Sequence, residues 1–272
     1  MTTIVNTNTK ALLAQQAQTL NQRTLDHAMG QLATGRRINS AADDAAGVAI
    51  SARMAAQVSS LGQAVRNAND GISMLQTADG AAQAVTDILH RMKELTVQYL
   101  HGTNSSEQRG YLADEFSGLT ARLSDIISDT TWNGHSVLAL AGGSVTFAVG
   151  SESADTHTVN FENFSSNASI SAASALNLST GSGSALSGIS DALDAVNGAR
   201  AEWGAAMNVL AFRADNASSV AMNLSASNSR IADADYAQAT ADMARAQIVR
   251  QAGTAMLSQA NQLPYMVMAL LR

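Results

Sequence analysis

The last 28 residues constrain the fold most strongly, because they carry an apolar stripe that a single helix cannot bury. Seven residues in this stretch recur at steps of four and three, the spacing of a coiled-coil seam on one helix face. They are Val249, Gly253, Met256, Ala260, Leu263, Val267 and Leu270. No acidic residue occurs after Asp242, and the sequence ends on Leu271 and Arg272. The stripe therefore predicts a partner helix.

The first 40 residues contain the expected partner. Their apolar residues lie roughly on one helical face, with glutamine, asparagine and threonine opposite. They are Leu13, Ala17, Leu20, Leu25, Ala28 and Leu32. Each end of the chain therefore predicts an amphipathic helix of roughly 30 residues, about 45 Å long. We expect the two helices to pair; the alternative is two independent surface helices.

The composition favours long helices over a compact globule. Hydrophobic residues make up 46% of the 272 residues but aromatic residues only 4%, and none occurs before Tyr99. Cores of compact domains are normally built from large side chains, whereas alanine-rich helices pack closely side by side. The predicted fold class is mainly α, a long coiled-coil-like helical bundle with a small β-hairpin insert and paired N- and C-terminal helices.

Three helical patterns lie between the terminal segments. The first runs from about residue 44 to 100 and contains Gly71 and Gly80, each of which costs about 1 kcal/mol relative to alanine. Both are tolerable if a neighbouring helix approaches closely there. The second follows a turn and ends near residue 130, and the third spans 187–228.

The stretch between the second and third helices has a different pattern. Alternating β-branched and aromatic residues in SVTFAVG and THTVNFENF predict a β-hairpin. Residues 165–188 are rich in serine, alanine and glycine and predict a loop, either undecorated or carrying an O-linked glycan. We therefore expect a terminal coiled-coil domain, 1–43 with 231–272, and a central domain, 44–230, with the insert at about 135–187.

Charge and cysteine content exclude several classes of protein. Each end has a net charge of +3 and the middle −12, which gives −6 overall. The basic residues are too scattered for a nucleic-acid site. No apolar run approaches ~18 residues, so we expect no membrane insertion. There is no cysteine, and no cleavable secretory signal begins the sequence. These facts alone predict a cytoplasmic protein.

No arrangement of residues predicts catalysis, a cofactor or a metal. None of the five histidines has a partner at the i, i+4 spacing of a helical zinc site. Asp43 and Asp44 stand where carboxylates favour a helix N-terminus, which is a better explanation than a metal site. Glu107, Asp114 and Glu115 predict a solvated helix face. We therefore expect no enzyme.

Several longer motifs carry a resemblance to a known family. The sequence contains LATGRRINSAADDAAGVAI at 32–50, RNANDGISMLQTADGA at 66–81 and RMKELTVQ at 91–98. Near its end it contains RIADADYA and MARAQIVRQAGTAMLSQANQLP. In this order, and over about 1–140 and 187–272, they resemble bacterial flagellin, in a short form without the large variable outer domains.

The resemblance implies a structural subunit of the bacterial flagellar filament. Flagellins are exported unfolded through the flagellar type III channel, which replaces the cytoplasmic prediction with a secreted one. Their terminal helices fold on assembly, and subunits add head-to-tail. The implied partners are further copies, the export apparatus and its chaperone, and the filament cap and hook-junction proteins. The implied inner-core seam is Leu13, Leu20, Leu25, Leu32, Met256, Leu263, Val267, Leu270, Leu271 and Arg272.

The resemblance also implies recognition by animal hosts. The Toll-like flagellin receptor contacts positions that match Arg91, Leu95 and Glu115 here, and each keeps the receptor-competent residue type. The alternative is that these residues serve subunit packing alone. A cytosolic inflammasome receptor reads the family's C-terminus, which corresponds to Val267, Leu270 and Leu271.

Three other classes of protein remain as alternatives. A hook–filament junction protein shares the terminal-helix architecture and would form a short ring. An enzyme could be grafted into the variable region, although about 50 residues leave little room for one. A generic coiled-coil scaffold lacks the paired terminal motifs.

Overall fold

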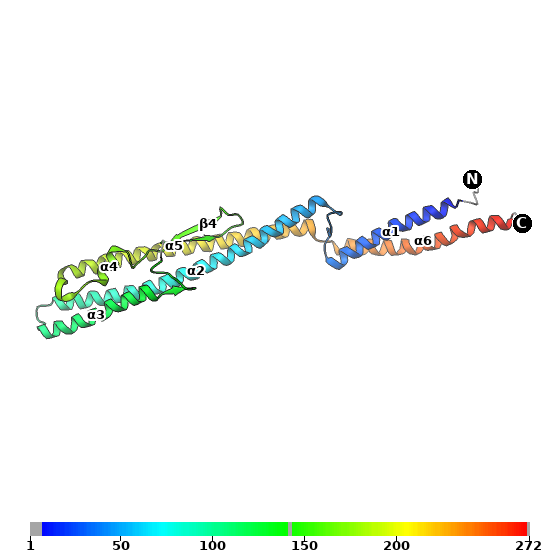
Figure 1. The fold of residues 1–272 in the computed structure, drawn as a ribbon. Coiled ribbons are helices and arrows are strands. Elements are labelled where there is room, and N and C mark those ends of the chain that lie inside the picture. Colours follow the sequence, from blue (N-terminus) through cyan, green and yellow to red (C-terminus); the bar gives the residue numbers. More distant parts are fainter. Residues whose placement is uncertain (1–6, 141–142, 271–272) are drawn as a thin grey trace. The chain divides into compact units, whose positions relative to one another are not determined.

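The computed structural model describes residues 7–140 and 143–270, with side chains described except at 180–182 and 263–270. Within these residues it contains six helices and four short strands (Figure 1). They are α1 (Thr9–Thr34), α2 (Ala45–Leu100), α3 (Ser106–Asp129), β1 (Thr131–Trp132), β2 (His135–Ser136), β3 (Ser144–Ala148), β4 (Thr156–Asn160), α4 (Ala168–Ser174), α5 (Leu178–Ala232) and α6 (Tyr236–Leu270). The mainly α fold class is confirmed.

Contacts divide the chain into two compact units. The terminal unit contains the described residues up to Ala56 and those from Asn223 onward, and the central unit contains Gln57–Met222. Helices α2 and α5 therefore contribute to both units. The domain boundaries expected between 43 and 44 and between 230 and 231 stay a prediction. No helix in the described part of the chain is long and apolar enough to cross a membrane.

In the terminal unit, α1 and α6 lie side by side and antiparallel, as expected (Figure 1). The side-chain amide of Asn8 donates to the carbonyl oxygen of Ala260 at 2.8 Å. Thirteen residues further along α1, Asn21 donates in the same way to Ala246, also at 2.8 Å. Partner numbers fall along α6 as they rise along α1, and the two bonds fix the register.

Small residues at heptad spacing bring the two helices together. Ala239, Ala246 and Ala260 of α6 are buried, and Gly253 completes the seven-residue spacing. On α1 the buried residues are Ala11, Leu25 and Ala28. Residues at this spacing share one helix face. The seam is therefore narrow and contains little large apolar surface.

A short joint connects the paired helices to α2 and α5. Gly35 ends α1 in the left-handed conformation, with φ 69°, which glycine adopts without steric cost. The backbone of Arg37 donates to the carbonyl oxygen of Ala232, and that of Ala234 donates to Gly35. The guanidinium of Arg37 also donates to the carbonyl oxygen of Ile231 at 2.7 Å. Hydrogen bonds thus join the segment that follows α1 to the segment that precedes α6.

The two adjacent aspartates of the joint satisfy backbone amides. Asp44 accepts from the amide of Gly47 at 2.8 Å and so caps the start of α2. Asp43 accepts from the amides of Ser40 and Asn39, which lower the pKa of its carboxyl group below the ordinary value. Among the described residues, no group of three or more potential ligands could hold a metal ion.

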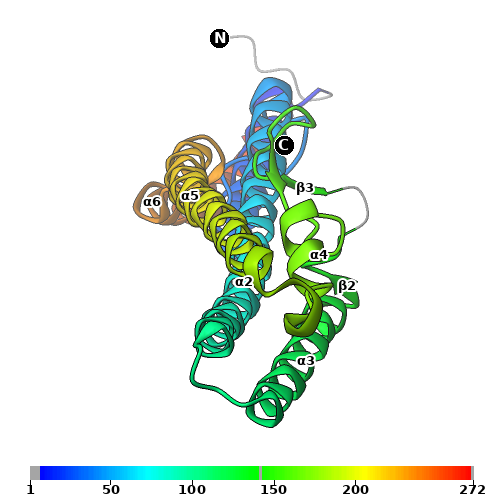
Figure 2. The same ribbon diagram turned by 90° about the vertical axis from the view of Figure 1, so that its left-hand side faces the viewer.

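In the central unit, α2, α3, α5 and the insert are arranged around one another (Figure 2). Their buried side chains form one continuous core. Its largest fully buried side chains include Leu75, Leu89 and Met92 of α2, Phe116 of α3 and Trp203 of α5. An ion pair of 2.7 Å between Arg200 and Asp79 joins α5 to α2. The large buried side chains are concentrated in this unit. The low aromatic content of the whole chain does not indicate this concentration.

The expected β-hairpin is confirmed, and it packs on the central helices. Strands β3 and β4 pair antiparallel, with Val145 opposite Val159. The indole nitrogen of Trp203 donates to the carbonyl oxygen of Asn160 at 3.1 Å. Gly71 of α2 leaves room for the hairpin, because an added Cβ there would lie 3.1 Å from the Phe147 ring.

The loop predicted for residues 165–188 is wrong. The segment forms α4 and the first turns of α5. Asn167 caps α4 by accepting from the amides of Ser169 and Ile170. Ile170 and Leu178 are almost completely buried, and this burial overrides the weak helix propensity of a serine-rich stretch. A further hairpin, β1–β2, was also not predicted.

Candidate assembly interface and partner-binding site

The paired terminal helices expose large apolar side chains. Leu12, Leu13 and Leu20 of α1 are 57%, 65% and 55% exposed, and Ile248 and Met256 of α6 are 67% and 64% exposed. The small residues of the seam are buried, while these large ones face outward. This inverts the usual arrangement, in which large apolar groups leave water first. The pair therefore presents apolar surface that the described part of the chain does not cover.

A groove follows one side of the pair, and we call it the terminal groove. It consists of two adjoining cavities of about 340 and 260 Å³. Both cavities are lined by Ala14 and Met256, and the other apolar lining residues are Leu13, Ala17, Val249, Ala252, Gly253 and Ala260. Lys10 is the charged residue of the lining. The groove therefore suits an apolar occupant.

The structure separates the ten residues of the expected inner-core seam. Leu25 is buried and Leu32 is half-buried in the pair, whereas Leu13, Leu20 and Met256 are exposed. The side chains of Leu263, Val267 and Leu270 lie outside the described residues, as do Leu271 and Arg272 altogether. Some residues of the apolar stripe predicted from the sequence therefore face the partner helix, and others face solvent.

One polar group lies inside the seam without a hydrogen bond. The side-chain oxygen of Gln18 is buried and has no partner. It lies against Gly253, where an added Cβ would be 2.8 Å from it. A buried unpaired polar oxygen lowers the stability of the folded state. The α1–α6 pair is therefore held by modest apolar burial and a few side-chain bonds.

On the central unit, the structure brings Arg91 and Glu115 together. Nη2 of Arg91 lies 2.7 Å from Oε1 of Glu115, and Nη1 lies 3.1 Å from Oε2 of Glu94. The bond to Glu115, followed by that to Glu94, raises the pKa of the arginine further. Leu95, the third expected residue, is completely buried in the core. Leu95 therefore lies beneath the surface that carries Arg91 and Glu115 and does not itself reach solvent.

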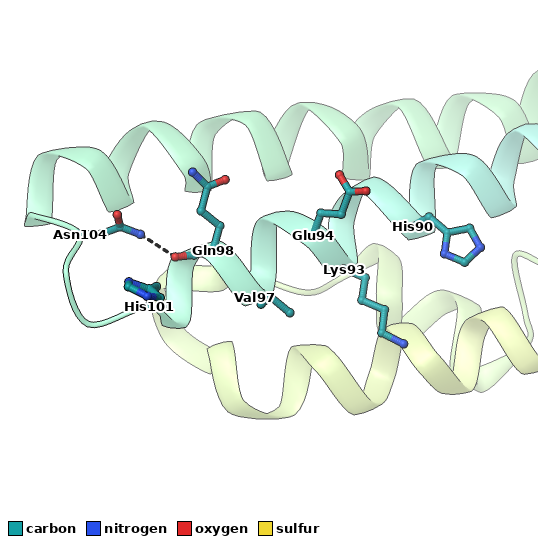
Figure 3. A pocket seen from close by; sticks show the side chains of 7 residues that line it. All are labelled: His90, Lys93, Glu94, Val97, Gln98, His101 and Asn104. Carbon is teal, nitrogen blue, oxygen red and sulfur yellow. Dashed lines mark hydrogen bonds between the residues drawn. The ribbon is translucent and has the colours of Figure 1, made fainter.

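Beside this ion pair lies a groove that the sequence did not suggest (Figure 3). Its volume is about 670 Å³, and it is lined by His90, Lys93, Glu94, Val97, Gln98, His101 and Asn104. The ammonium of Lys93 points toward α5, where it meets the hydroxyl of Ser190 at 3.2 Å. His90, Glu94, Val97 and His101 recur at helical spacing, which could have indicated a shared face.

A chain of this kind is a structural protein built for self-assembly, because its two ends pair and leave apolar surface uncovered. Residues 5–142 match the bacterial flagellin N-terminal helical region, and residues 186–271 match the C-terminal one. The chain belongs to the bacterial flagellin family.

Relatives and a solved structure agree. The chain is 38% identical to a flagellin of Halalkalibacterium halodurans, over 99% of this chain and all of that one. It is 34% identical to the flagellar filament 33 kDa core protein of Treponema phagedenis, with the same coverage. The crystal structure of Bacillus cereus flagellin matches with a TM-score of 0.51 and 27% identity, covering 56% of this chain and 88% of that one.

These similarities identify a structural subunit of the flagellar filament. The chain is 31% identical to polar flagellin F of Vibrio parahaemolyticus over 376 aligned positions, which include all of both chains. This chain has 272 residues, so it is a short form without the variable domain. The reading as a hook–filament junction protein is not favoured.

Proposed function

We propose that neighbouring copies cover the exposed apolar surface of the terminal unit and so build the filament. The observation that carries this is the exposure of Leu13, Leu20 and Met256 on helices whose seam holds mostly small residues. The terminal domain, 1–43 with 231–272, forms the inner core. Apolar burial at roughly 25 cal/mol per Å² drives subunit addition.

The growth proceeds head-to-tail. Leu12 and Ile248 are exposed but do not line the terminal groove, so the pair offers apolar projections and an apolar groove at different places. A projection on one copy that enters a groove on the next makes a heterologous contact, which extends without closing. The geometry supports an open polymer over a symmetric dimer.

Export in the unfolded state is part of the proposal. The subunit is secreted through the flagellar export apparatus, with a chaperone covering its apolar end, and it meets the cap and junction proteins outside the cell. The narrow α1–α6 seam and the unpaired oxygen of Gln18 support this, because a weakly held terminal unit unfolds readily. We assign no catalysis to the chain.

Host recognition is a second proposal, on the central unit. The Toll-like flagellin receptor would contact the pair formed by Arg91 and Glu115, with Leu95 maintaining the surface from the core. The exposure of both charged side chains, 49% for Arg91 and 44% for Glu115, supports this. Recognition of Val267, Leu270 and Leu271 by a cytosolic receptor also stays a proposal.

Seeded growth tests the assembly proposal. Monomers are added to short filament seeds with ammonium sulfate, which strengthens apolar burial, and elongation is followed by electron microscopy. We expect long tubes from the unchanged chain. Leu13→Asp with Met256→Asp, or removal of 231–272, should stop growth. Gln16→Asp with Gln251→Asp puts the same two charges on exposed positions of α1 and α6 outside the groove and should permit growth.

Normal elongation of the Leu13→Asp and Met256→Asp double variant would overturn the assignment of the groove. Rings instead of tubes, from unchanged protein intact at both ends, would favour a junction protein.

A further inference from the structure

The turn of the β1–β2 hairpin consists of Asn133 and Gly134. Both residues are exposed, and both have a positive φ, 49° and 79°. Positive φ at both central residues is typical of a two-residue type I′ turn, for which Asn-Gly is a favoured sequence. An added Cβ at Gly134 would meet nothing within 4 Å. The turn therefore projects into open space.

The sequence contains a second Asn-Gly pair in a different backbone conformation. Asn197 and Gly198 are also exposed, but they lie in the interior of α5. There the helix engages the backbone N–H of Gly198, because each interior N–H donates to the carbonyl group four residues earlier. Among the described residues, the N–H of Gly134 donates to no backbone acceptor of a turn, loop or cap.

We propose that Asn133 is a site of spontaneous deamidation, which converts it to aspartate and isoaspartate and opens the β1–β2 hairpin. Asparagine is among the thermolabile residues of proteins. The inference goes beyond the proposed function and does not depend on it. The site lies in the central unit, so it requires neither assembly nor the pairing of the terminal helices.

The reaction needs water and no other reactant. The backbone nitrogen of Gly134 loses its proton and attacks the side-chain carbonyl carbon of Asn133. A carbon–nitrogen bond forms, the bond to the side-chain amide nitrogen breaks, and that nitrogen takes up protons and leaves as ammonia. Water then opens the five-membered succinimide at one of its two carbonyl groups. One opening gives aspartate, and the other gives isoaspartate.

The backbone around each pair decides which one reacts. Ring closure requires the attacking nitrogen to be free and the peptide unit to rotate toward the side chain. In α5 this rotation breaks hydrogen bonds on both sides of Gly198, so the helix must first unfold locally. Only two residue pairs close the β1–β2 hairpin, and such a short hairpin opens at little cost. Asn133 therefore reacts, and Asn197 is protected.

The isoaspartate product changes the hairpin because it lengthens the main chain by one methylene. Loop length fixes the register of a hairpin, so the pairing of Trp132 with His135 is lost. The change stops at Val137, which is completely buried and whose amide donates to the carbonyl oxygen of Thr130 at 3.2 Å. Deamidation therefore loosens the turn and leaves the core of the central unit in place.

Ageing of the full chain in mildly alkaline buffer tests the site. Peptide mass spectrometry follows the conversion of both asparagines. We expect Asn133 to convert roughly a hundredfold faster than Asn197, because local opening is far less costly in the hairpin than inside α5. In guanidinium chloride at the same pH, α5 unfolds and the two rates should become similar. This control separates the folded structure from the local sequence.

Amide hydrogen exchange before and after ageing tests the consequence. Exchange at residues 131–136 should increase in the aged wild type. Asn133→Gly is the matched variant, because glycine accepts the positive φ and lacks the side-chain amide; its exchange should not change on ageing. Equal rates at 133 and 197 in the native chain, or no conversion of Asn133, would overturn the site. Confirmed isoaspartate at 133 with unchanged exchange would overturn the opening of the hairpin.

Discussion

The side-chain amide of Asn21 donates a hydrogen bond to the carbonyl oxygen of Ala246, and this bond sets the register of α1 on α6. Asn21→Ala should weaken the pair by about 1 kcal/mol, the usual net value of such a bond. The amide hydrogens of residues 239–262 should therefore exchange with solvent at a higher rate. Gln22→Ala changes the adjacent, exposed position as a control. Unchanged exchange in Asn21→Ala would mean that apolar contacts and the Asn8–Ala260 bond hold the register without Asn21.

The two glycines of α2 should respond differently to alanine. An added Cβ at Gly80 would meet nothing within 4 Å, whereas one at Gly71 would lie 3.1 Å from both Leu210 and Phe147. Gly80→Ala should therefore raise the free energy of unfolding by about 0.5–1 kcal/mol. Gly71→Ala should give no gain, because the neighbours must move. Thermal unfolding followed by circular dichroism compares them, and equal midpoints would contradict the contrast.

His157 should make the central unit less stable in mild acid. Burial, and then the charge of Arg213, lower the pKa of His157 from its ordinary value of 6.5. Above pH 6.5 the imidazole is neutral in both states and has no effect. Below it the unfolded chain binds the proton first, so stability falls as the pH drops toward the folded-state pKa.

Denaturant midpoints at pH 7.5 and 5.5 measure this effect. They are read from tryptophan fluorescence, because both tryptophans, Trp132 and Trp203, lie in the central unit. His157→Gln removes the titration and should reduce the difference between the two midpoints. An identical difference in wild type and variant would assign the acid sensitivity to other groups.

Leu95 and Glu115 should affect stability and receptor activation in different ways. Leu95→Ala leaves a cavity in the core and should lower the free energy of unfolding by about 2–5 kcal/mol. Glu115→Gln breaks an exposed ion pair and should cost about 1 kcal/mol or less. If the receptor site is as proposed, Glu115→Gln still lowers receptor activation in reporter cells. Glu107→Gln, on the same helix, controls for charge, and equal loss in both would remove the assignment.

The sequence predicted the pairing of the ends because helical spacing persists at both, and it predicted β3–β4 because Val145, Phe147 and Val159 alternate with polar residues. It did not predict which residues face the partner helix. Ala11 and Ala246 have little apolar surface. The larger leucine and methionine side chains therefore determined which face the sequence pattern assigns to the seam. Only the observed register places Leu13 and Met256 on the outside.

The failure at residues 165–188 has a different cause. Serine and glycine have low helix propensity, and local composition carries no information about contacts with distant residues. Ile170 and Leu178 enter the core, and these contacts order the segment. The groove near His90 is lined by residues of α2 and of the turn that follows it. Helical spacing indicates that several of these residues share a face, but it does not indicate that the face is hollowed.

The antiparallel pairing has a consequence for synthesis. Its two side-chain bonds join residues 225 and 252 positions apart, so nearly the whole chain must be made before α1 meets α6. Loop-closure entropy also makes such distant contacts slow to form. During translation, Leu12, Leu13 and Leu20 therefore leave the ribosome long before α6 has been made. They remain without their helix partner for most of synthesis. This delay leaves the nascent N-terminus open to aggregation for nearly the full duration of translation.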